Sequence, residues 1–136
     1  MGMRSINKQV IADFRAGREI SIEGMHRERL VLLTTIGERT FAPSTVPVMF
    51  TTTDRGILVV ASNDGAEEDP QWFHNIVADP LVHVEEPTRE YDGAARVLAQ
   101  KARTEAWKRL IDQHPFFVDQ QEKAGRELPL VEITKT

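Results

Sequence analysis

The chain has 136 residues, of which 40% are hydrophobic and 28% are charged, and it contains no cysteine. This composition is typical of a soluble globular protein and excludes a disordered chain, a disulfide framework, a thiolate metal site and a cysteine nucleophile. The length suits one domain spanning residues 1–136, in which residues 1–28 form an N-terminal helix and a lead-in segment. Since neither an apolar run of about 18 residues nor a signal-peptide pattern occurs, we expect a cytoplasmic location.

The formal net charge of −4 is unevenly distributed along the chain. Residues 54–95 carry 10 Asp and Glu but 2 Lys and Arg, whereas residues 96–136 carry 6 and 8. A nucleic acid would be repelled by the acidic middle third, and no basic stripe with interleaved aromatic residues occurs elsewhere. The sequence therefore argues against a nucleic-acid partner.

The first half of the chain predicts one helix followed by strands. Residues 5–17 have apolar positions at helical spacing, with Ser5 as the expected N-cap and a glycine at the end. Residues 30–36, "LVLLTTI", predict a strand buried on both faces. Residues 44–62 predict a β-hairpin whose bulged turn uses positive φ at Gly56, and Pro47 predicts a bulge or a sheet edge in its first strand.

The second half alternates helices with strands. Asp69 is the expected cap of a helix that has Pro70 as its first residue and ends before Asp79-Pro80. A second hairpin follows at 81–100, then a helix that starts at Thr104, a short helix from 116 to 125, and a last strand at 128–134. Hairpins with inserted helices predict an α+β fold, mainly β, in which an antiparallel sheet curls into a small barrel.

The sequence lacks the common side-chain motifs of enzyme active sites. The four histidines, His26, His74, His83 and His114, do not have metal-ligand spacing, and we expect no metal. His83 alternates with valines, which is typical of the less apolar face of a strand. Nucleophile motifs such as GxSxG, and nucleotide motifs such as GxGxxG, are also missing, so we expect no catalytic side chain.

One corner of the sequence can bind a ligand through its backbone. Ala61 and Ser62 end a strand, residues 63–65 form a tight turn, and a helix N-terminus then directs free N–H groups toward that turn. Such a corner suits a planar, anionic ligand. The alternative is a capped turn that closes the barrel, with Trp72 and its neighbours as core packing.

Two long segments and two shorter ones resemble the deazaflavin-dependent nitroreductase family. The segment "VVASNDGAEEDPQWFHNIVADPLVHVE" resembles the family's strand ending in Ala-Ser, its glycine turn and its Pro-x-Trp-aromatic-x-Asn helix. The segment "LVLLTTIGERTFAPSTVPVMF" resembles its Leu-Leu-Thr-Thr-x-Gly loop and the strand after it, and "VIADFRAG" and "LPLVEI" also fit. The agreement in order and spacing spans nearly the whole chain.

The resemblance implies a split β-barrel, similar to FMN-binding barrels, that binds coenzyme F-420 and passes hydride from its reduced ring to a quinone, a nitroaromatic or an activated enone. The cofactor would supply the redox chemistry, so no catalytic side chain is needed. The cofactor-binding residues implied are Glu38, Arg39, Thr40, Ser44, Thr45, Val46, Val60, Ala61, Ser62, Asn63, Gln71, Trp72, Phe73, His74 and Asn75. The apolar wall for the substrate would comprise Met49, Phe116 and Phe117, each of which could equally be plain core.

The chain also departs from the family's pattern. Glu38 stands where a basic residue is usual, Ser44 replaces an arginine and Asn63 replaces a lysine, so the anionic part of the cofactor would lose charge-assisted contacts. The C-terminal tyrosines of the family are His114, Phe117 and Gln120 here. These differences keep two alternatives open: an FMN-dependent reductase of the same shape, and a non-enzymatic barrel that binds an apolar ligand such as a fatty acid or quinone.

Partners follow from the same resemblance. We expect a small-molecule electron acceptor and no transmembrane segment. A homodimer and a peripheral contact with a membrane are both compatible with the sequence, although no motif in it specifies either one.

Overall fold

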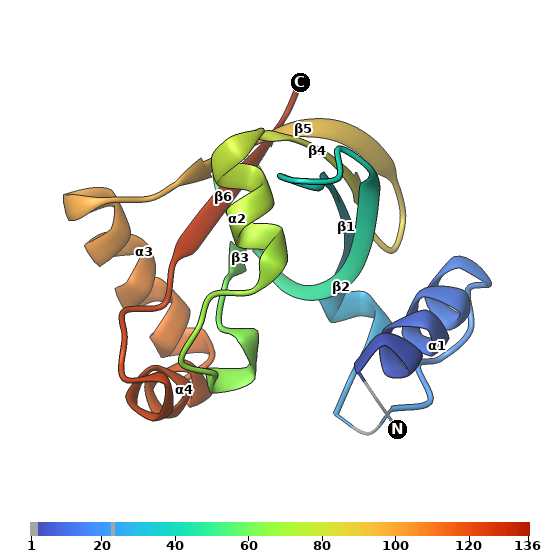
Figure 1. Cartoon of the computed structure of the whole chain (residues 1–136). Helices are drawn as coiled ribbons and strands as arrows, with labels where there is room; N and C mark the ends of the chain where they lie inside the picture. The colour runs from blue at the N-terminus through green and yellow to red at the C-terminus, as the bar shows by residue number, and fades with distance from the viewer. Residues whose placement is uncertain (1–2, 23) are drawn as a thin grey trace.

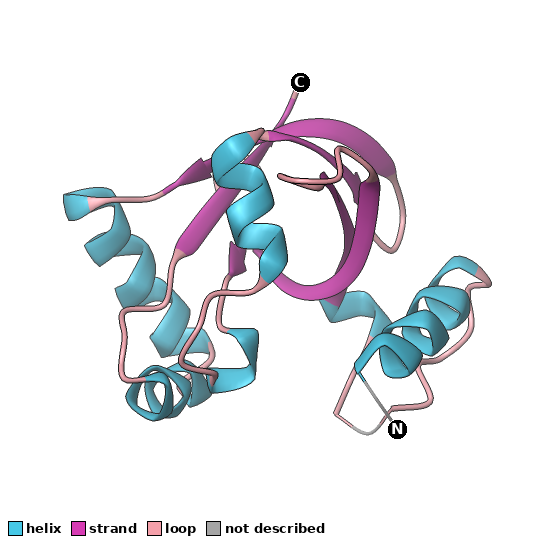
Figure 2. Ribbon diagram, in the orientation of Figure 1, coloured by secondary structure: helices cyan, strands magenta, loops and turns pink. Residues whose placement is uncertain are grey.

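The described residues form a closed antiparallel barrel with helices around it (Figures 1 and 2). The computed structural model describes residues 3–22 and 24–136; residues 1, 2 and 23 of the predicted N-terminal segment lie outside the described part. The barrel order is β1-β2-β3-β6-β5-β4. The elements are α1 (Met3–Arg15), η1 (Arg27–Arg29), β1 (Leu30–Ile36), β2 (Pro43–Thr52), β3 (Ile57–Val60), η2 (Asn63–Gly65), α2 (Gln71–Ala78), β4 (Leu81–Glu85), β5 (Glu90–Val97), α3 (Gln100–Gln113), α4 (Phe116–Ala124) and β6 (Leu130–Lys135). The prediction of an antiparallel barrel of mainly β class is confirmed.

The barrel interior is filled by alternate residues of its strands. Val31 and Leu33 of β1 meet Ile57 and Val59 of β3, together with the inward residues of β4, β5 and β6. The period of two in each strand sends every second side chain into this cluster. Strand β1 is buried on both faces over most of its length, as its continuous apolar run predicts.

Strand β2 divides its pairing between two neighbours. Residues 43–49 pair with β1 in an unbroken register, and residues 50–52 pair with β3. Residues 43–49 consequently have β1 on one side and no strand on the other. Pro47 lies in this stretch, where a missing backbone N–H is tolerated. The edge predicted from Pro47 is confirmed, and the alternative of a bulge is wrong because the register has no gap.

Helices cover the barrel on several sides. Figure 1 shows α3 and α4 on one side, α1 on the opposite side, and α2 across the opening between them. Helices α3 and α4 pack on the outer face of β3 and β6 through Leu110 and Phe117. Helix α1 packs on the outer face of β1 through Val10 and Phe14. Helix α2 closes the barrel, since Trp72 belongs to the interior cluster.

The predicted helix caps are wrong at three places. Helix α1 begins at Met3, so Ser5 lies inside it rather than at its N-cap. Helix α3 begins at Gln100, and the Thr104 hydroxyl donates back to the Gln100 carbonyl within the helix. The N-cap of α2 is Pro70, not Asp69, whose carboxylate is bound elsewhere. Capping preferences are local, and tertiary contacts override them here.

The predicted role of Gly56 is also wrong. Gly56 is not among the residues with positive φ. A Cβ at this position would instead lie 2.0 Å from the carbonyl oxygen of Ile133 on β6. The hairpin turn thus requires glycine because the backbone of β6 passes close by.

The His83 imidazole provides a test of pH-dependent stability. It lies on the outside of the β4–β5 hairpin, with Nδ1 2.8 Å from Asp92 and Nε2 2.8 Å from Glu90. These hydrogen bonds, that to Asp92 first, raise the pKa of His83 above its ordinary value of 6.5. A folded-state pKa above the unfolded one gives a contribution that is complete below the unfolded pKa and lost as pH rises through the folded pKa.

We therefore expect His83→Asn to lower the melting temperature more at about pH 6 than at about pH 8.5, because the contribution of the raised pKa is lost as pH rises through the folded-state value. Thermal denaturation at the two pH values measures this gap. His26→Asn serves as the control, because His26 makes no side-chain cap bond at η1. An equal effect of His83→Asn at both pH values would contradict the assignment.

Candidate functional site

The corner after β3 is a compact, strained turn. Ala61 extends the strand by donating its N–H to the carbonyl of Pro129 at 2.9 Å. The next residues form the single turn η2, in which Asn63, Asp64 and Gly65 have φ of 48°, 55° and 76°. Asparagine, aspartate and glycine are the residues that adopt this left-handed region most readily. The predicted tight turn is confirmed, and the chain then runs through residues 66–70 into α2.

Asn75 ties α2 to the strand and the loop beside it. Its side chain is 2% exposed. Asn75 Nδ2 donates to Thr35 Oγ1 on β1 at 3.0 Å, and Asn75 Oδ1 accepts the backbone N–H of Glu38 at 3.1 Å. Gln71 Nε2 donates both to Asn75 Oδ1 at 3.0 Å and to Glu38 Oε1 at 3.2 Å. The predicted residues 38, 71 and 75 are thus brought together, with Asn75 positioning the loop rather than facing solvent.

Arg126 holds the segment between β3 and α2, a role that no sequence motif indicates. Its guanidinium donates to the carbonyls of Ala61, Ser62, Ala66 and Glu68 at 3.0–3.4 Å. Arg126 Nη1 also lies 2.6 Å from Asp69 Oδ1, with both side chains mostly buried. An arginine has five N–H donors in a fixed plane, which suits a segment that turns several carbonyls to one side.

A second cation from the same region reaches the turn. Lys123 Nζ, on α4, donates to the carbonyl of Asp64 at 3.2 Å. Asp64 directly follows Asn63, which stands where a basic residue was expected. The positive charge that the local sequence lacks at this turn is therefore supplied by α4, about 60 residues further along the chain.

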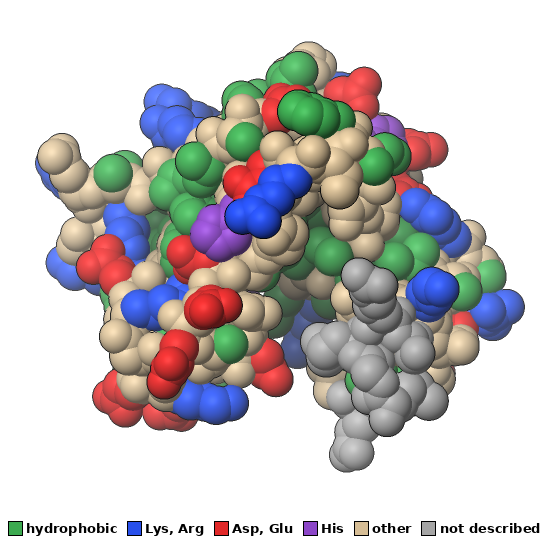
Figure 3. Space-filling view, in the orientation of Figure 1, with side chains coloured by type: hydrophobic (Ala, Val, Ile, Leu, Met, Phe, Trp, Pro, Cys, Tyr) green, Lys and Arg blue, Asp and Glu red, His purple; other side chains and the backbone are tan. Residues whose placement is uncertain are grey.

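The free edge of β2 forms the other side of the site. Val46, Val48 and Phe50 are only half-buried, although they pack against the barrel core. Figure 3, in the orientation of Figure 1, shows the surface hollowed beneath α2, with hydrophobic side chains in the hollow. A strand edge also leaves backbone N–H and C=O groups without strand partners. This side of the site is therefore an apolar surface, the apolar bed, bordered along one edge by polar main-chain groups.

The remaining predicted cofactor positions lie around this region. Thr45 exchanges a hydrogen bond of 2.7 Å with Thr34 of β1, and its neighbour Ser44 is exposed. Arg39 and Thr40 are exposed in the loop at 37–42, where Arg39 makes no ion pair with another described residue. On α2, His74 is exposed beside the half-buried Phe73. Val60 is half-buried at the end of β3 and packs on the outer cluster.

The predicted substrate wall is divided by the fold. Phe117 belongs to the core between α4 and the barrel and is 5% exposed. Met49 is partly buried against the clusters beneath α1 and α4. Phe116, by contrast, is 42% exposed, and its ring packs 4.3 Å from that of Phe117. Of the three, Phe116 has the most area open to a ligand.

Comparison with known proteins decides the family. Residues 8–135 match the family model described as F420H(2)-dependent quinone reductase. The chain belongs to this family. A Mycobacterium tuberculosis relative, Rv3178, is 28% identical over 85 residues, which cover 62% of this chain and 71% of the relative. The F420H(2)-dependent quinone reductase Rv1261c of that organism is 25% identical over 108 residues, which cover 77% and 72%.

Solved structures agree with the family. An F420-H2 dependent reductase, FDR-A, superposes with a TM-score of 0.69 and 30% identity, covering 82% of this chain and all of that one. The prediction of a deazaflavin-dependent oxidoreductase with a split barrel is thus confirmed for the family. In the part of the chain that the structure describes, no helix has the length and apolarity needed to cross a bilayer. The same residues contain no cluster of His, Asp and Glu suited to a metal ion.

The residues present fit coenzyme F-420 in two respects. The half-buried apolar bed on β2 and its unpaired edge suit a flat ring with polar margins, as this family requires. For the anionic part of the cofactor, two positive charges are present: Arg39 is exposed in the loop at 37–42, and Lys123 reaches the turn at Asp64. Helix α2 has no side-chain cap, and the N–H of Phe73 donates to the Pro70 carbonyl at 3.0 Å, which leaves the N–H groups of Gln71 and Trp72 for an acceptor.

Arg126→Gln should loosen the segment at 61–69. The substitution leaves the mostly buried Asp69 carboxylate without its partner and removes donors from partly buried carbonyls, which we expect to lower the free energy of unfolding by about 2–4 kcal/mol. Hydrogen exchange should quicken more at residues 61–69 than in α1. Chemical denaturation and exchange mass spectrometry measure the two effects, and Arg29→Gln, at an exposed site, is the matched control. Unaltered exchange at 61–69 would refute the role given to Arg126.

Proposed function

We propose that this chain reduces a quinone with hydride taken from reduced coenzyme F-420. The observation that carries the proposal is the match of residues 8–135 to the quinone reductase family. When bound, the reduced cofactor supplies a hydride from its deazaflavin ring. The chain then has to bind and orient two flat molecules and keep water away, which agrees with the lack of a side-chain nucleophile.

The proposed cofactor site lies between the free edge of β2 and the corner formed by η2 and α2. Val46, Val48 and Phe50 would support the ring, and backbone groups of the β2 edge and of Ser62 would meet its polar margin. Arg39 and Lys123 would attract the anionic chain. The loop at 37–42 is fixed from below by Asn75, so the site is preorganised before the cofactor arrives.

Assembly and membrane contact are also proposals. One solved relative with a TM-score of 0.71 and 28% identity is described as a domain-swapped dimer and covers 94% of this chain and 95% of its own. That relative supports a homodimer here, for which light scattering would have to give twice the chain mass of 15.4 kDa. A peripheral membrane contact would bring the enzyme to lipid-soluble quinones, and flotation with vesicles tests it.

The activity is tested by mixing the purified chain, reduced coenzyme F-420 and a quinone under anaerobic conditions. We expect the oxidised deazaflavin absorbance to appear only when all three are present. Substituting reduced FMN for the deazaflavin should give no enzyme-dependent turnover. Saturable binding of coenzyme F-420 without quinone reduction would reject the acceptor, whereas the absence of binding would reject the cofactor.

Two cations should contribute to cofactor affinity. A charge-assisted hydrogen bond contributes about 1.5–3 kcal/mol, so Arg39→Ala and Lys123→Ala should each raise the Kd for oxidised coenzyme F-420 about tenfold or more. Titration by quenching of deazaflavin fluorescence measures this, and melting temperatures check that the variants are folded. Arg29→Ala changes the net charge equally and should leave the Kd unchanged. A similar loss in all three variants would show that only long-range charge matters.

A further inference from the structure

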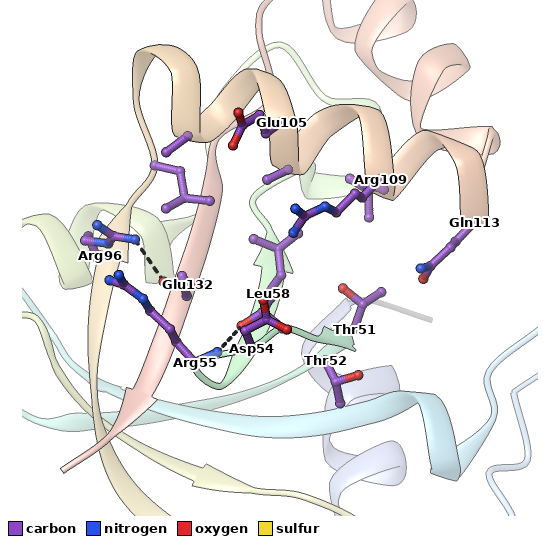
Figure 4. Close-up of a pocket in the computed structure, with 15 residues that line it drawn as sticks. Thr51, Thr52, Asp54, Arg55, Leu58, Arg96, Glu105, Arg109, Gln113 and Glu132 are labelled. Atoms are coloured by element: carbon purple, nitrogen blue, oxygen red, sulfur yellow. Dashed lines mark hydrogen bonds and ion pairs between the residues drawn. The ribbon is translucent and has the colours of Figure 1, made fainter.

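A cavity lies outside the barrel, beneath α3. Its volume is about 450 Å³, and it opens between α3, the β2–β3 turn and the outer faces of β5 and β6 (Figure 4). Its floor is apolar and consists of Leu58, Leu98, Ala102, Ala106 and Leu110. None of the predicted cofactor or substrate residues lines it. The volume of the cavity lies in the range of small-molecule sites, and its lining combines charged side chains with the apolar floor.

Three arginines from different elements line the cavity. Arg55 comes from the β2–β3 turn, Arg96 from β5 and Arg109 from α3. Arg96 Nη2 donates to Glu132 Oε1 at 2.9 Å, and Glu132 is 9% exposed. Figure 4 shows the Arg55 side chain extending toward this ion pair and the Arg109 side chain extending over Leu58. Neither Arg55 nor Arg109 forms a side-chain hydrogen bond or ion pair with another described residue.

The balance of charge around the cavity is positive after pairing. Glu132 is neutralised by Arg96, and Glu105 lies 4.0 Å from Lys101 on the same helix. Among the described residues, Asp54 is then the one lining carboxylate without a basic partner, whereas two lining arginines, Arg55 and Arg109, have no acidic partner. Although the lining holds three arginines and three carboxylates, pairing leaves an arrangement with two unpaired guanidinium groups, of Arg55 and Arg109, beside the apolar floor. It favours an anion whose body is apolar.

We propose that this cavity is a binding site for a small organic carboxylate with a flat or aliphatic body. The apolar part lies on the floor formed by β3 and α3. The carboxylate accepts hydrogen bonds from Arg55 and Arg109, since a planar guanidinium matches a carboxylate with two parallel bonds. The hydroxyls of Thr51, Thr52 and Thr53 line the same side and offer further donors. The site is separate from the proposed cofactor site and does not depend on it.

The test uses 2-naphthoate as the probe and 2-naphthylmethanol as its neutral counterpart. Two-dimensional amide NMR of the labelled 15.4 kDa chain should show saturable shifts at residues 51–55 and 102–109 with the carboxylate. The neutral compound should bind at least about tenfold more weakly, because it lacks the charge that the arginines recognise. Saturation with coenzyme F-420 should not displace the probe.

Variants then locate the binding determinants. The double substitution Arg55→Gln/Arg109→Gln should raise the Kd for 2-naphthoate about tenfold or more. Ala102→Trp, at an exposed helix position, should fill the floor and abolish the shifts at residues 51–55 without lowering the melting temperature. Arg29→Gln should bind as the unaltered chain does. Shifts elsewhere, equal binding of the neutral compound, or unchanged affinity in the double variant would each overturn the proposal.

Discussion

The unequal lengths of neighbouring strands shape this protein. Strand β2 spans Pro43–Thr52, whereas β3 spans Ile57–Val60 and pairs with only the last three residues of β2. A barrel can close under these conditions only if one strand leaves part of its edge unpaired. Each unpaired N–H and C=O must then find water or a ligand. The free edge at 43–49 is therefore the place where a closed barrel can still bind something through its backbone.

Two polar side chains, those of Asn75 and Arg126, hold α2 and the segments beside it in place across from this edge. Asn75 both accepts and donates, so it can join a strand and a loop to α2 at one buried point. Arg126 donates to several carbonyls of the irregular segment between β3 and α2, and so binds that segment to the end of α4. Because both groups are satisfied within the protein, they act as supports, and the groups that they position are left for ligands.

The pattern of apolar residues was sufficient to predict most helices and strands, since alternation and helical spacing report directly which faces are buried. Exact helix starts were not predictable. Asp69 has the residue type of a cap, but its carboxylate is used by Arg126. Thr104 also has that type, yet Gln100 begins α3 one turn earlier, in a backbone with φ of 51°. Gly56 is required by the approach of β6, which is over 70 residues away in sequence.

The electrostatics of the site were the least predictable part, because ion pairing depends on contacts that are distant in sequence. The local sequence, with Glu38, Asn63 and the acidic run at 67–69, indicates a corner that would repel an anionic cofactor. In the fold, Asp69 is neutralised by Arg126 and the turn after Asn63 gains Lys123, both from the C-terminal quarter. A ligand at this corner interacts with the charge that remains after such pairing. In the proposed site, the cationic contacts with the cofactor would therefore come from Lys123 of α4 as well as from Arg39 of the loop.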